Sequence, residues 1–365
     1  MGNYKWTGLL LGAVALLLRG VAARFPTHTE AIYSRTFFPM IRQSIDATVG
    51  KLPFPTVYLF AAAVVWVLVL FFFRHVRKEG WQSKLRHLVR SMLNFVGFLV
   101  FFFLLLWGYN YQRVPVYQQL SIEAELLSPD QLLDELHLTH ELLAQLRKQL
   151  SSDTLAIAHT VAYPELEATV RAEMKKTLPE LGLDAKGQPR TKEFYPPGFM
   201  KKMGILGIYF PYTGESYIDP ELHVLEKPFT VAHEMAHSFG ITDEGEANFI
   251  SWVVGVQSAD FLLQYAAHLQ LLRYQLREMS RRDPEMYKEV VLNLDPGVKN
   301  DIISILLKAR QTPPVFGELS RKSNDLYLKT QGVKAGVRSY AQLPALAYAW
   351  RKIQQVSGNR DPSLP

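Results

Sequence analysis

The sequence of 365 residues contains no cysteine. This absence excludes disulfide bonds, cysteine-ligated zinc and thiol redox chemistry. Internal repeats and low-complexity tracts are also missing, so neither a solenoid nor a long disordered linker is expected. Charged residues are scarce in one place only, because the first 110 residues hold long apolar runs while the remainder has the composition of a water-exposed helical protein. The sequence therefore predicts a membrane region followed by one sizeable globular domain.

Three apolar segments, at about residues 6–23, 53–73 and 92–109, are long enough to cross a bilayer as helices. We expect a membrane region over 1–112 with three transmembrane helices. The first segment also has the features of a cleaved signal peptide, but a retained anchor is favoured because it opens a region with several spans. Buried core helices are the alternative for the other two, which their extreme apolarity disfavours.

The residues between the second and third segments, 74–91, carry most of the excess positive charge of a chain whose net charge is +6. The basic residues of this segment are Arg74, Arg77, Lys78, Lys84, Arg86 and Arg90, and its one acidic residue is Glu79. A basic loop between two spans stays in the cytoplasm. The interpretation is a multi-pass protein of the cell (inner) membrane, with an extracytoplasmic domain over 113–365. The same block accounts for the basic isoelectric point, so the lipid bilayer is an expected partner and nucleic acid is not.

Patterns in 113–365 predict an α+β, mostly helical domain. The Ser128-Pro129-Asp130 run is typical of a helix start. The other expected elements are helices at 164–178, 229–239 and 243–254, a loop at 184–197, a short strand at 204–210, and long helices ending near 279 and starting near 301 and 340.

The run His-Glu-Met-Ala-His places His233 and His237 at i and i+4, on one face of a helix. Imidazole nitrogen is a preferred ligand of zinc, which keeps an open position when it is catalytic. Glu234, the next residue, would act as the general base on the attacking water. The alternative is a surface helix with two solvated histidines. Val231 and Met235 lie on the opposite face and are expected in the core.

Three acidic residues are candidates for the third metal ligand. Gly240 is expected to end the first helix in a left-handed conformation and to turn the chain back. Asp243 has the spacing of metzincin-type sites. Glu244 begins a Glu-x-x-Ala-Asn run that resembles the Glu-x-x-Ala-Asp run of glutamate-zincins, in which the Glu binds zinc and the residue four later holds a ligand histidine. Glu246 cannot face the metal together with Glu244, and Glu244 is favoured.

Several stretches together resemble the bacterial family DUF3810. They are 210–215, 228–237, 244–249, 324–329 and 336–340, together with the apolar spans. The resemblance covers most of the chain and implies an HExxH-type membrane metallopeptidase with no known substrate. The family often has a Gln-Arg pair where this chain has Ser238 and Phe239, a change expected to leave the ligands intact but to affect the pocket.

Weaker candidates complete the site. Tyr340 and Arg338 are expected to be interior or rim residues of the last helix, with polarisation of a substrate carbonyl as the alternative. The 204–210 strand is either a plain sheet strand or an edge offered to an extended peptide. Glu215 is expected to be a solvated turn residue, with a substrate contact as the alternative. His223 and His268 are isolated and expected to be packing or surface residues.

The sequence therefore predicts a zincin-like domain that hydrolyses peptide bonds in peptide or protein substrates. Its one cofactor is Zn²⁺, with His233, His237 and Glu244 as ligands and Glu234 as catalytic base. The main alternative is a non-catalytic, zinc-stabilised regulatory or binding protein of the membrane. Intramembrane proteolysis is disfavoured, because the motif lies about 120 residues beyond the last span among acidic residues that are too polar for a bilayer.

Overall fold

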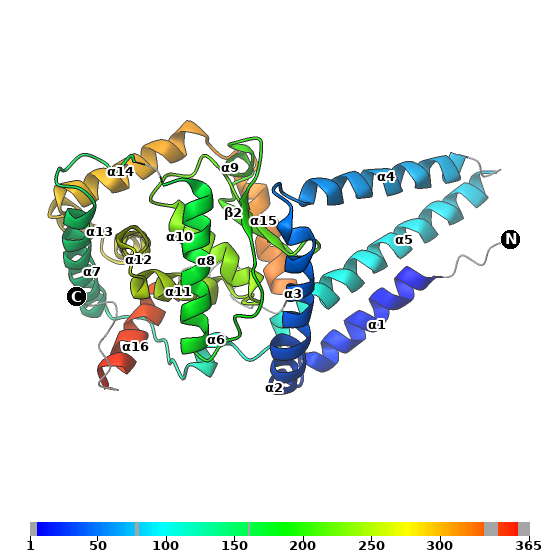
Figure 1. Cartoon of the computed structure of the whole chain (residues 1–365), viewed down its shortest axis with the longest axis horizontal. Coiled ribbons are helices and arrows are strands. Elements are labelled where there is room, and N and C mark those ends of the chain that lie inside the picture. The colour runs from blue at the N-terminus through cyan, green and yellow to red at the C-terminus, as the bar shows by residue number, and fades with distance from the viewer. Residues whose placement is uncertain (1–5, 77–79, 160, 332–341, 357–365) are drawn as a thin grey trace. The chain divides into compact units, whose positions relative to one another are not determined.

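The computed structural model describes residues 6–76, 80–159, 161–331 and 342–356, and these are mostly helical with one small sheet (Figure 1). This agrees with the predicted α+β class. The chain forms two compact units. Unit 1 comprises residues 1–114 with 187–189 and 210–215, and unit 2 comprises 115–186, 190–209 and 216–365.

Unit 1 is built from helices, and α1 packs closely on α5. Its elements are α1 (Thr7–Ala22), α2 (Pro26–His28), the π-helical η1 (Thr29–Phe37), α3 (Phe38–Ala47), η2 (Val49–Lys51), α4 (Val57–Val76), α5 (Trp81–Leu106) and η3 (Gly108–Gln112). The α1–α5 contact depends on glycine, because a Cβ on Gly97 would lie 2.2 Å from the carbonyl oxygen of Gly8. The Gly8 amide also donates to Asn94 Oδ1 at 2.8 Å.

By length and composition, α5 is one helix able to cross a membrane. A second such span results if α1 and the helical stretch Pro26–Ala47, which meet at a bend of 112°, are counted together. The apolar part of α4, Val57–Phe73, is shorter than a full span. The predicted third segment began at 92, but α5 begins at Trp81. The basic residues Lys84, Arg86 and Arg90 therefore lie on a helix rather than in the expected loop, while 77–79 lie outside the described residues.

Glu215 does not occupy the solvated turn, nor the substrate contact, that the sequence suggested. It is fully buried within unit 1, where it accepts hydrogen bonds from the Thr56 amide at 2.9 Å and the Thr56 hydroxyl at 2.7 Å. Nearby, the buried Arg42 pairs with Asp46 and donates to the Gly214 carbonyl. Buried charges of this kind are stable only when paired, so Glu215 has a structural role.

Unit 2 contains the remaining helices and most of a small three-stranded sheet. The helices are α6 (Val116–Gln119), α7 (Pro129–Leu150), α8 (Tyr163–Glu180), α9 (Phe199–Lys202), α10 (Lys227–Ser238), α11 (Glu244–Gln257), α12 (Phe261–Arg282), α13 (Pro284–Leu292), α14 (Pro296–Gln311), α15 (Gly317–Thr330) and α16 (Leu343–Val356). The predicted start at Ser128 is confirmed, since Ser128 and Gln131 form a capping box on α7.

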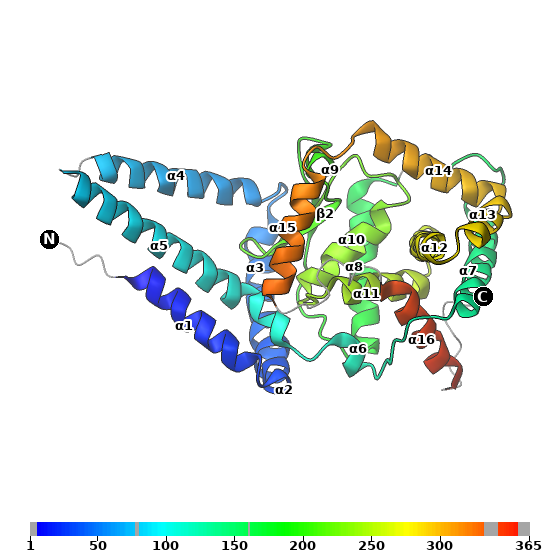
Figure 2. The same ribbon diagram turned by 180° about the vertical axis from the view of Figure 1, so that it is seen from behind.

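The sheet has the order β1-β3-β2. Its strands are β1 (Thr191–Glu193), β2 (Gly207–Phe210) and β3 (Glu215–Ile218), with β1 parallel to β3 and Thr191 opposite Ser216. β1 lies inside the segment expected to be a loop, because its pairing to β3 is non-local and leaves no signal in so short a run. β2 is an edge strand of the sheet, and α15 lies beside it (Figure 2). Just before α15, the Val315 amide donates to the carbonyl of Lys202, the last residue of α9, at 2.8 Å.

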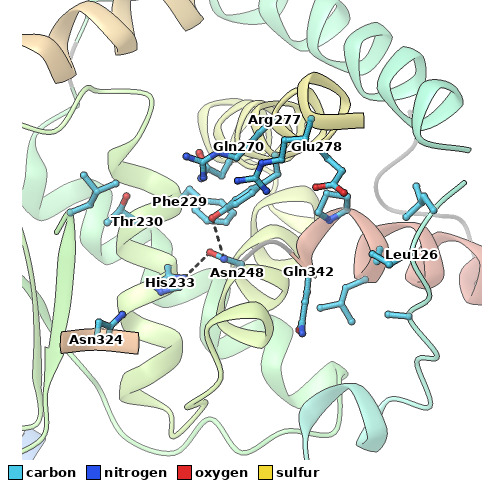
Figure 3. A pocket seen from close by; sticks show the side chains of 18 of the residues that line it. Leu126, Phe229, Thr230, His233, Asn248, Gln270, Arg277, Glu278, Asn324 and Gln342 are labelled. Atoms are coloured by element: carbon cyan, nitrogen blue, oxygen red, sulfur yellow. Dashed lines mark hydrogen bonds between the residues drawn. The ribbon is translucent and has the colours of Figure 1, made fainter. Parts of the chain in front are cut away.

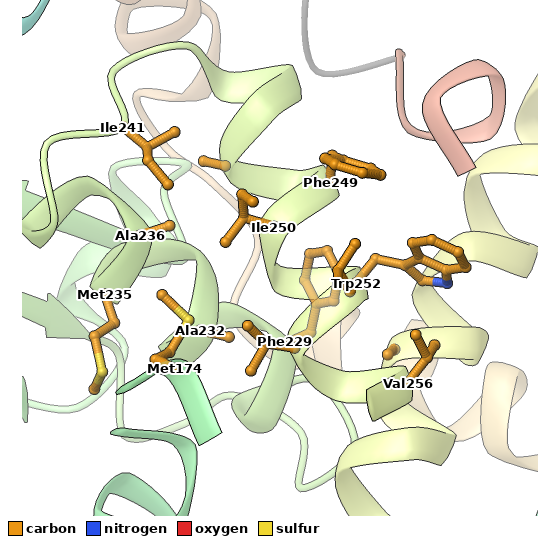
Figure 4. Packing of buried hydrophobic residues seen from close by; sticks show 14 of the residues in the cluster. Met174, Phe229, Ala232, Met235, Ala236, Ile241, Phe249, Ile250, Trp252 and Val256 are labelled. Carbon is orange, nitrogen blue, oxygen red and sulfur yellow. The ribbon is translucent and has the colours of Figure 1, made fainter. Parts of the chain in front are cut away.

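The main core of unit 2 lies between α8, α10 and α11 (Figure 4). Val231 and Met235 on α10 are fully buried, as their position opposite the histidines predicted. Phe249 and Trp252 of α11 pack against the same cluster. Because α10 and α11 are fixed to each other by this apolar contact, the polar side chains on their other faces are held in a defined geometry.

Candidate metal centre

The end of α10 fixes one of the two histidines. Gly240 has φ +85°, and its amide donates to the His237 carbonyl at 3.0 Å while the Ile241 amide donates to Ala236 at 3.2 Å. These are the two hydrogen bonds of a Schellman motif, in which glycine takes the left-handed position. The turn brings the Ile241 carbonyl to 2.7 Å from His237 Nδ1. A carbonyl oxygen only accepts, so His237 Nδ1 donates and its Nε2 is the ring atom left to bind a metal.

The second histidine is oriented from α11. His233 Nδ1 lies 2.9 Å from Asn248 Oδ1, and Asn248 Nδ2 donates to the Tyr274 hydroxyl at 3.3 Å (Figure 3). With its amide nitrogen used in this way, Asn248 presents its oxygen to His233, whose Nδ1 therefore donates. This is the role predicted for Asn248. Both imidazoles thus direct Nε2 into the same space, and these two atoms are 3.1 Å apart.

Glu244 supplies the third acceptor atom. Its Oε2 lies 3.1 Å from His233 Nε2 and 3.3 Å from His237 Nε2. The other two candidate acids have different partners. Asp243 caps α11 by accepting from the Gly245 and Glu246 amides at 2.8 and 3.1 Å, and Glu246 accepts from the Tyr117 amide at 3.3 Å. Of the three acidic residues, Glu244 is the one that the structure brings to the histidine pair.

The residues His233, His237 and Glu244 are buried and could hold a metal ion. Three nitrogen and oxygen atoms of this kind at 3.1–3.3 Å from one another repel unless a proton or a metal cation lies among them. Ligand bonds of 2.0–2.1 Å in a tetrahedral zinc site place neighbouring ligand atoms about 3.3 Å apart. The donor set and its spacing therefore fit a small divalent ion with nitrogen and oxygen ligands.

The electrostatics of the triad also favour a cation. Burial by itself would lower the pKa of His237, but the Glu244 carboxylate, Glu234 and the Ile241 carbonyl outweigh it and raise that pKa to about 9. Burial would likewise raise the pKa of Glu244, yet His237 and His233 bring it well below its usual range. Glu244 is therefore ionised at neutral pH, and the centre attracts positive charge.

Glu234 is buried one residue along α10 from His233, and it lies against the start of β2. A Cβ on Gly207 would meet Glu234 Oε1 at 2.5 Å, so only glycine leaves room for the carboxyl group. Burial raises the pKa of Glu234 to about 7, against the opposing effect of His233 and His237. A carboxyl group with a pKa near neutrality can both accept and release a proton, which is the property of a general acid–base catalyst.

The backbone of Glu234 is held by two serines. Ser216 Oγ of β3 donates to the Glu234 carbonyl at 2.7 Å and lies 2.7 Å from Ser238 Oγ. Ser238 is fully buried and Phe239 belongs to the core, and neither lines the cavity beside the metal centre. The change at these two residues was expected to affect the pocket, but both side chains help to anchor α10 and neither forms part of the cavity wall.

A cavity of about 1300 Å³ opens beside His233 and Glu234. It is bounded by α10, α11, α12, α15, the start of α16 and the segment 204–207 (Figure 3).

Tyr340 and Arg338, the candidate carbonyl-polarising residues, lie outside the described residues. His223 bonds Ser304 Oγ at 3.0 Å and His268 is buried, so both are packing residues as predicted. Sequence reasoning missed Gly207 and Tyr274, whose roles depend on contacts between distant segments.

A profile of the family described as "Protein of unknown function (DUF3810)" matches residues 33–348. No curated protein and no solved structure matches the chain.

Proposed function

The chain belongs to the DUF3810 family, for which no function is described, and we propose from the geometry of its metal centre that it is a membrane-anchored zinc metallopeptidase. The observation that carries the proposal is the convergence of His233 Nε2, His237 Nε2 and Glu244 Oε2 at 3.1–3.3 Å, beside the buried carboxyl group of Glu234. Two histidines and a carboxylate are a ligand set of hydrolytic zinc sites. A site that only stabilised the fold would need neither a second acidic residue, Glu234, nor the large cavity.

His233, His237 and Glu244 would hold the ion, and zinc at this place supplies a Lewis acid that polarises a peptide carbonyl and acidifies water. Glu234 accepts the proton of the attacking water and then donates it to the leaving amine. Asn248 and the Ile241 carbonyl keep the two imidazoles in the tautomer that binds metal.

The substrate is a peptide in extended form. β2 is an edge strand, and the chain that leads into it, from Gly204 to Gly207, lines the cavity next to Glu234. Backbone groups of such an edge hydrogen-bond an added strand without regard to side chains. Side-chain selection then falls to the other walls of the cavity. The zincin-like character of the domain is part of this proposal.

Membrane anchoring follows the apolar helices. We infer that α1, α4 and α5 each cross the cell membrane, with the segment between α4 and α5 in the cytoplasm and unit 2 outside it. The basic residues Lys84, Arg86 and Arg90 near the start of α5 support this orientation. Because the chain has no cysteine, single substitutions Gln82→Cys and Glu180→Cys give an unambiguous test. A membrane-impermeant maleimide applied to intact cells should label only Glu180→Cys, and labelling of Gln82→Cys alone would reverse the topology.

The catalytic proposal is tested with the full-length protein in detergent, loaded with zinc and incubated with a library of quenched fluorescent peptides. Glu234→Gln should reduce kcat at least a hundredfold while zinc content stays at the wild-type level, since Glu234 is not among the three converging ligands. Glu165→Gln, an exposed change on α8, is the control and should retain activity. If wild type and Glu234→Gln were equally inactive on every peptide while both bound zinc, the alternative of a non-catalytic, zinc-stabilised membrane protein would replace the proposal.

A further inference from the structure

One face of α12 forms a wall of the cavity. Gln270, Tyr274, Arg277 and Arg281 all line it, and they follow one another at spacings of four, three and four residues. Such spacings place side chains in one row along a helix. Figure 3 shows Arg277, Gln270 and Glu278 projecting from α12 on the side of the cavity that Asn248 faces. The row therefore forms one wall of the cavity that opens beside His233 and Glu234.

The positive charge of this wall is not neutralised by ion pairs among the residues that the structure describes. Arg277 and Arg281 are exposed, and Arg321 of α15 also lines the cavity. Among the described residues, no acidic side chain forms an ion pair with any of these three arginines. Arg282 differs, because it pairs with Glu278 at 2.7 Å. Apart from Glu278 and the proposed base Glu234, the only acid on the described lining is Glu125.

One residue of the row, Tyr274, is connected to the metal centre. Tyr274 is linked through Asn248 to His233 by hydrogen bonds of 3.3 and 2.9 Å. At a rise of 1.5 Å per residue, Arg277 lies about 4.5 Å and Arg281 about 10 Å further along the α12 axis. An extended peptide advances about 3.3 Å per residue. A peptide laid parallel to α12 from the level of Tyr274 would bring the two guanidinium groups beside positions roughly one and three residues from the scissile bond.

We propose that this cavity selects acidic peptides, with Arg277 and Arg281 binding Asp or Glu side chains within about three residues on one side of the cleaved bond. The inference rests on the proposed peptidase function and names its substrate class. Guanidinium groups bind carboxylates in bidentate geometry. A cleft lined by one sign of charge also concentrates ligands of the other sign. Arg321 adds to the same field from the opposite element, α15.

Binding is measured first, because it does not require turnover. The probe is a fluorescent decapeptide with three Glu residues, compared by anisotropy with the same peptide carrying Gln, on the full-length zinc-loaded Glu234→Gln protein in detergent. We expect the Glu peptide to bind at least tenfold more tightly in low salt and to lose this preference in high salt. Adding Arg277→Gln and Arg281→Gln should each reduce its affinity about fivefold. Arg310→Gln, an exposed arginine of α14 outside the cavity, should have no effect.

Charge reversal gives the sharper result. The double variant Arg277→Glu and Arg281→Glu should prefer a Lys peptide to the Glu peptide, both in binding and in the cleavage rate of the otherwise wild-type enzyme. Equal binding of the Glu and Gln peptides, or an unchanged preference in the double variant, would overturn the inference. So would a short single-stranded DNA that displaced the Glu peptide at a lower concentration than unlabelled Glu peptide. Cleavage of neutral peptides without acidic preference would refute the inference alone, whereas charge-dependent binding without any cleavage would refute the peptidase function alone.

Discussion

The imidazole of His233 is linked to the amide of Asn248 by a hydrogen bond of 2.9 Å between Nδ1 and Oδ1. The two side chains come from different helices, α10 and α11, and Tyr274 of α12 holds the amide in turn at 3.3 Å. Three helices therefore cooperate to set the orientation of one proposed ligand. Outer groups of this kind fix the tautomer and the direction of a metal-binding imidazole.

Replacing Asn248 should weaken metal binding without removing a ligand. For Asn248→Leu we expect zinc affinity to fall 10- to 100-fold, because His233 loses the acceptor that keeps its proton on Nδ1. Asn248→Asp should preserve it, since a carboxylate also accepts. Competition with a fluorescent zinc chelator measures the affinity, with Asn300→Leu on α14 as a matched control. Wild-type affinity in Asn248→Leu would mean that the contact plays no part in the site.

Gly207 limits the space around the proposed base. A methyl group there would come within 2.5 Å of Glu234 Oε1, so Gly207→Ala must displace the carboxyl group or the strand. We expect kcat to fall ten- to a hundredfold, with zinc affinity unchanged because the ligand atoms lie elsewhere. Peptide cleavage and zinc titration are measured side by side. Ile208→Ala, on an exposed neighbouring side chain, should behave as wild type, and a fully active Gly207→Ala would show that Glu234 needs no fixed position.

The residues of the metal centre show how much of the site the sequence alone predicts. His233, His237 and Glu244 were predictable because helical spacing and a helix-ending glycine are local properties of the chain. The choice of Glu244 over Asp243 and Glu246 followed only from a family-like pattern, and the structure supplies the reason, since the other two acids bond backbone amides.

The failures have a common cause. The sequence around Glu215 predicts a turn, yet the Glu215 carboxylate is buried against Thr56, which lies 159 positions away in the chain. The close approach of Gly207 to Glu234 and the bond of Tyr274 to Asn248 likewise join segments that a periodicity pattern cannot relate. β1 was missed because three residues carry no strand signal without their partner β3. Expectations for Tyr340 and Arg338 stay predictions.

His268 should make folding sensitive to acid. It is buried on α12, and burial together with the nearby positive charge of Arg351 lowers its pKa from 6.5 to about 3. Between these values the unfolded chain binds a proton that the folded chain does not, so the contribution is complete above about pH 6.5 and is lost as the pH falls toward 3. The free energy of unfolding should decrease by up to about 1.4 kcal/mol per pH unit in this window from this group.

Denaturant unfolding of the full-length protein at pH 7.5, 6 and 5 measures the slope. His268→Gln should flatten the dependence on pH relative to wild type. His137→Gln, at an exposed position on α7, is the matched control and should leave the slope unchanged. An identical slope in His268→Gln would show that this imidazole is protonated in the folded protein.

The most direct test of the account is the zinc content of the full-length protein after saturation with zinc and removal of the excess. Wild type should retain one zinc ion per chain, while His237→Ala and Glu244→Ala should retain little. Glu246→Gln, which changes the neighbouring acid that bonds the Tyr117 amide, should retain the full amount. Wild-type zinc content in Glu244→Ala, or no tightly bound zinc in the wild type, would contradict the metal centre on which the proposed function depends.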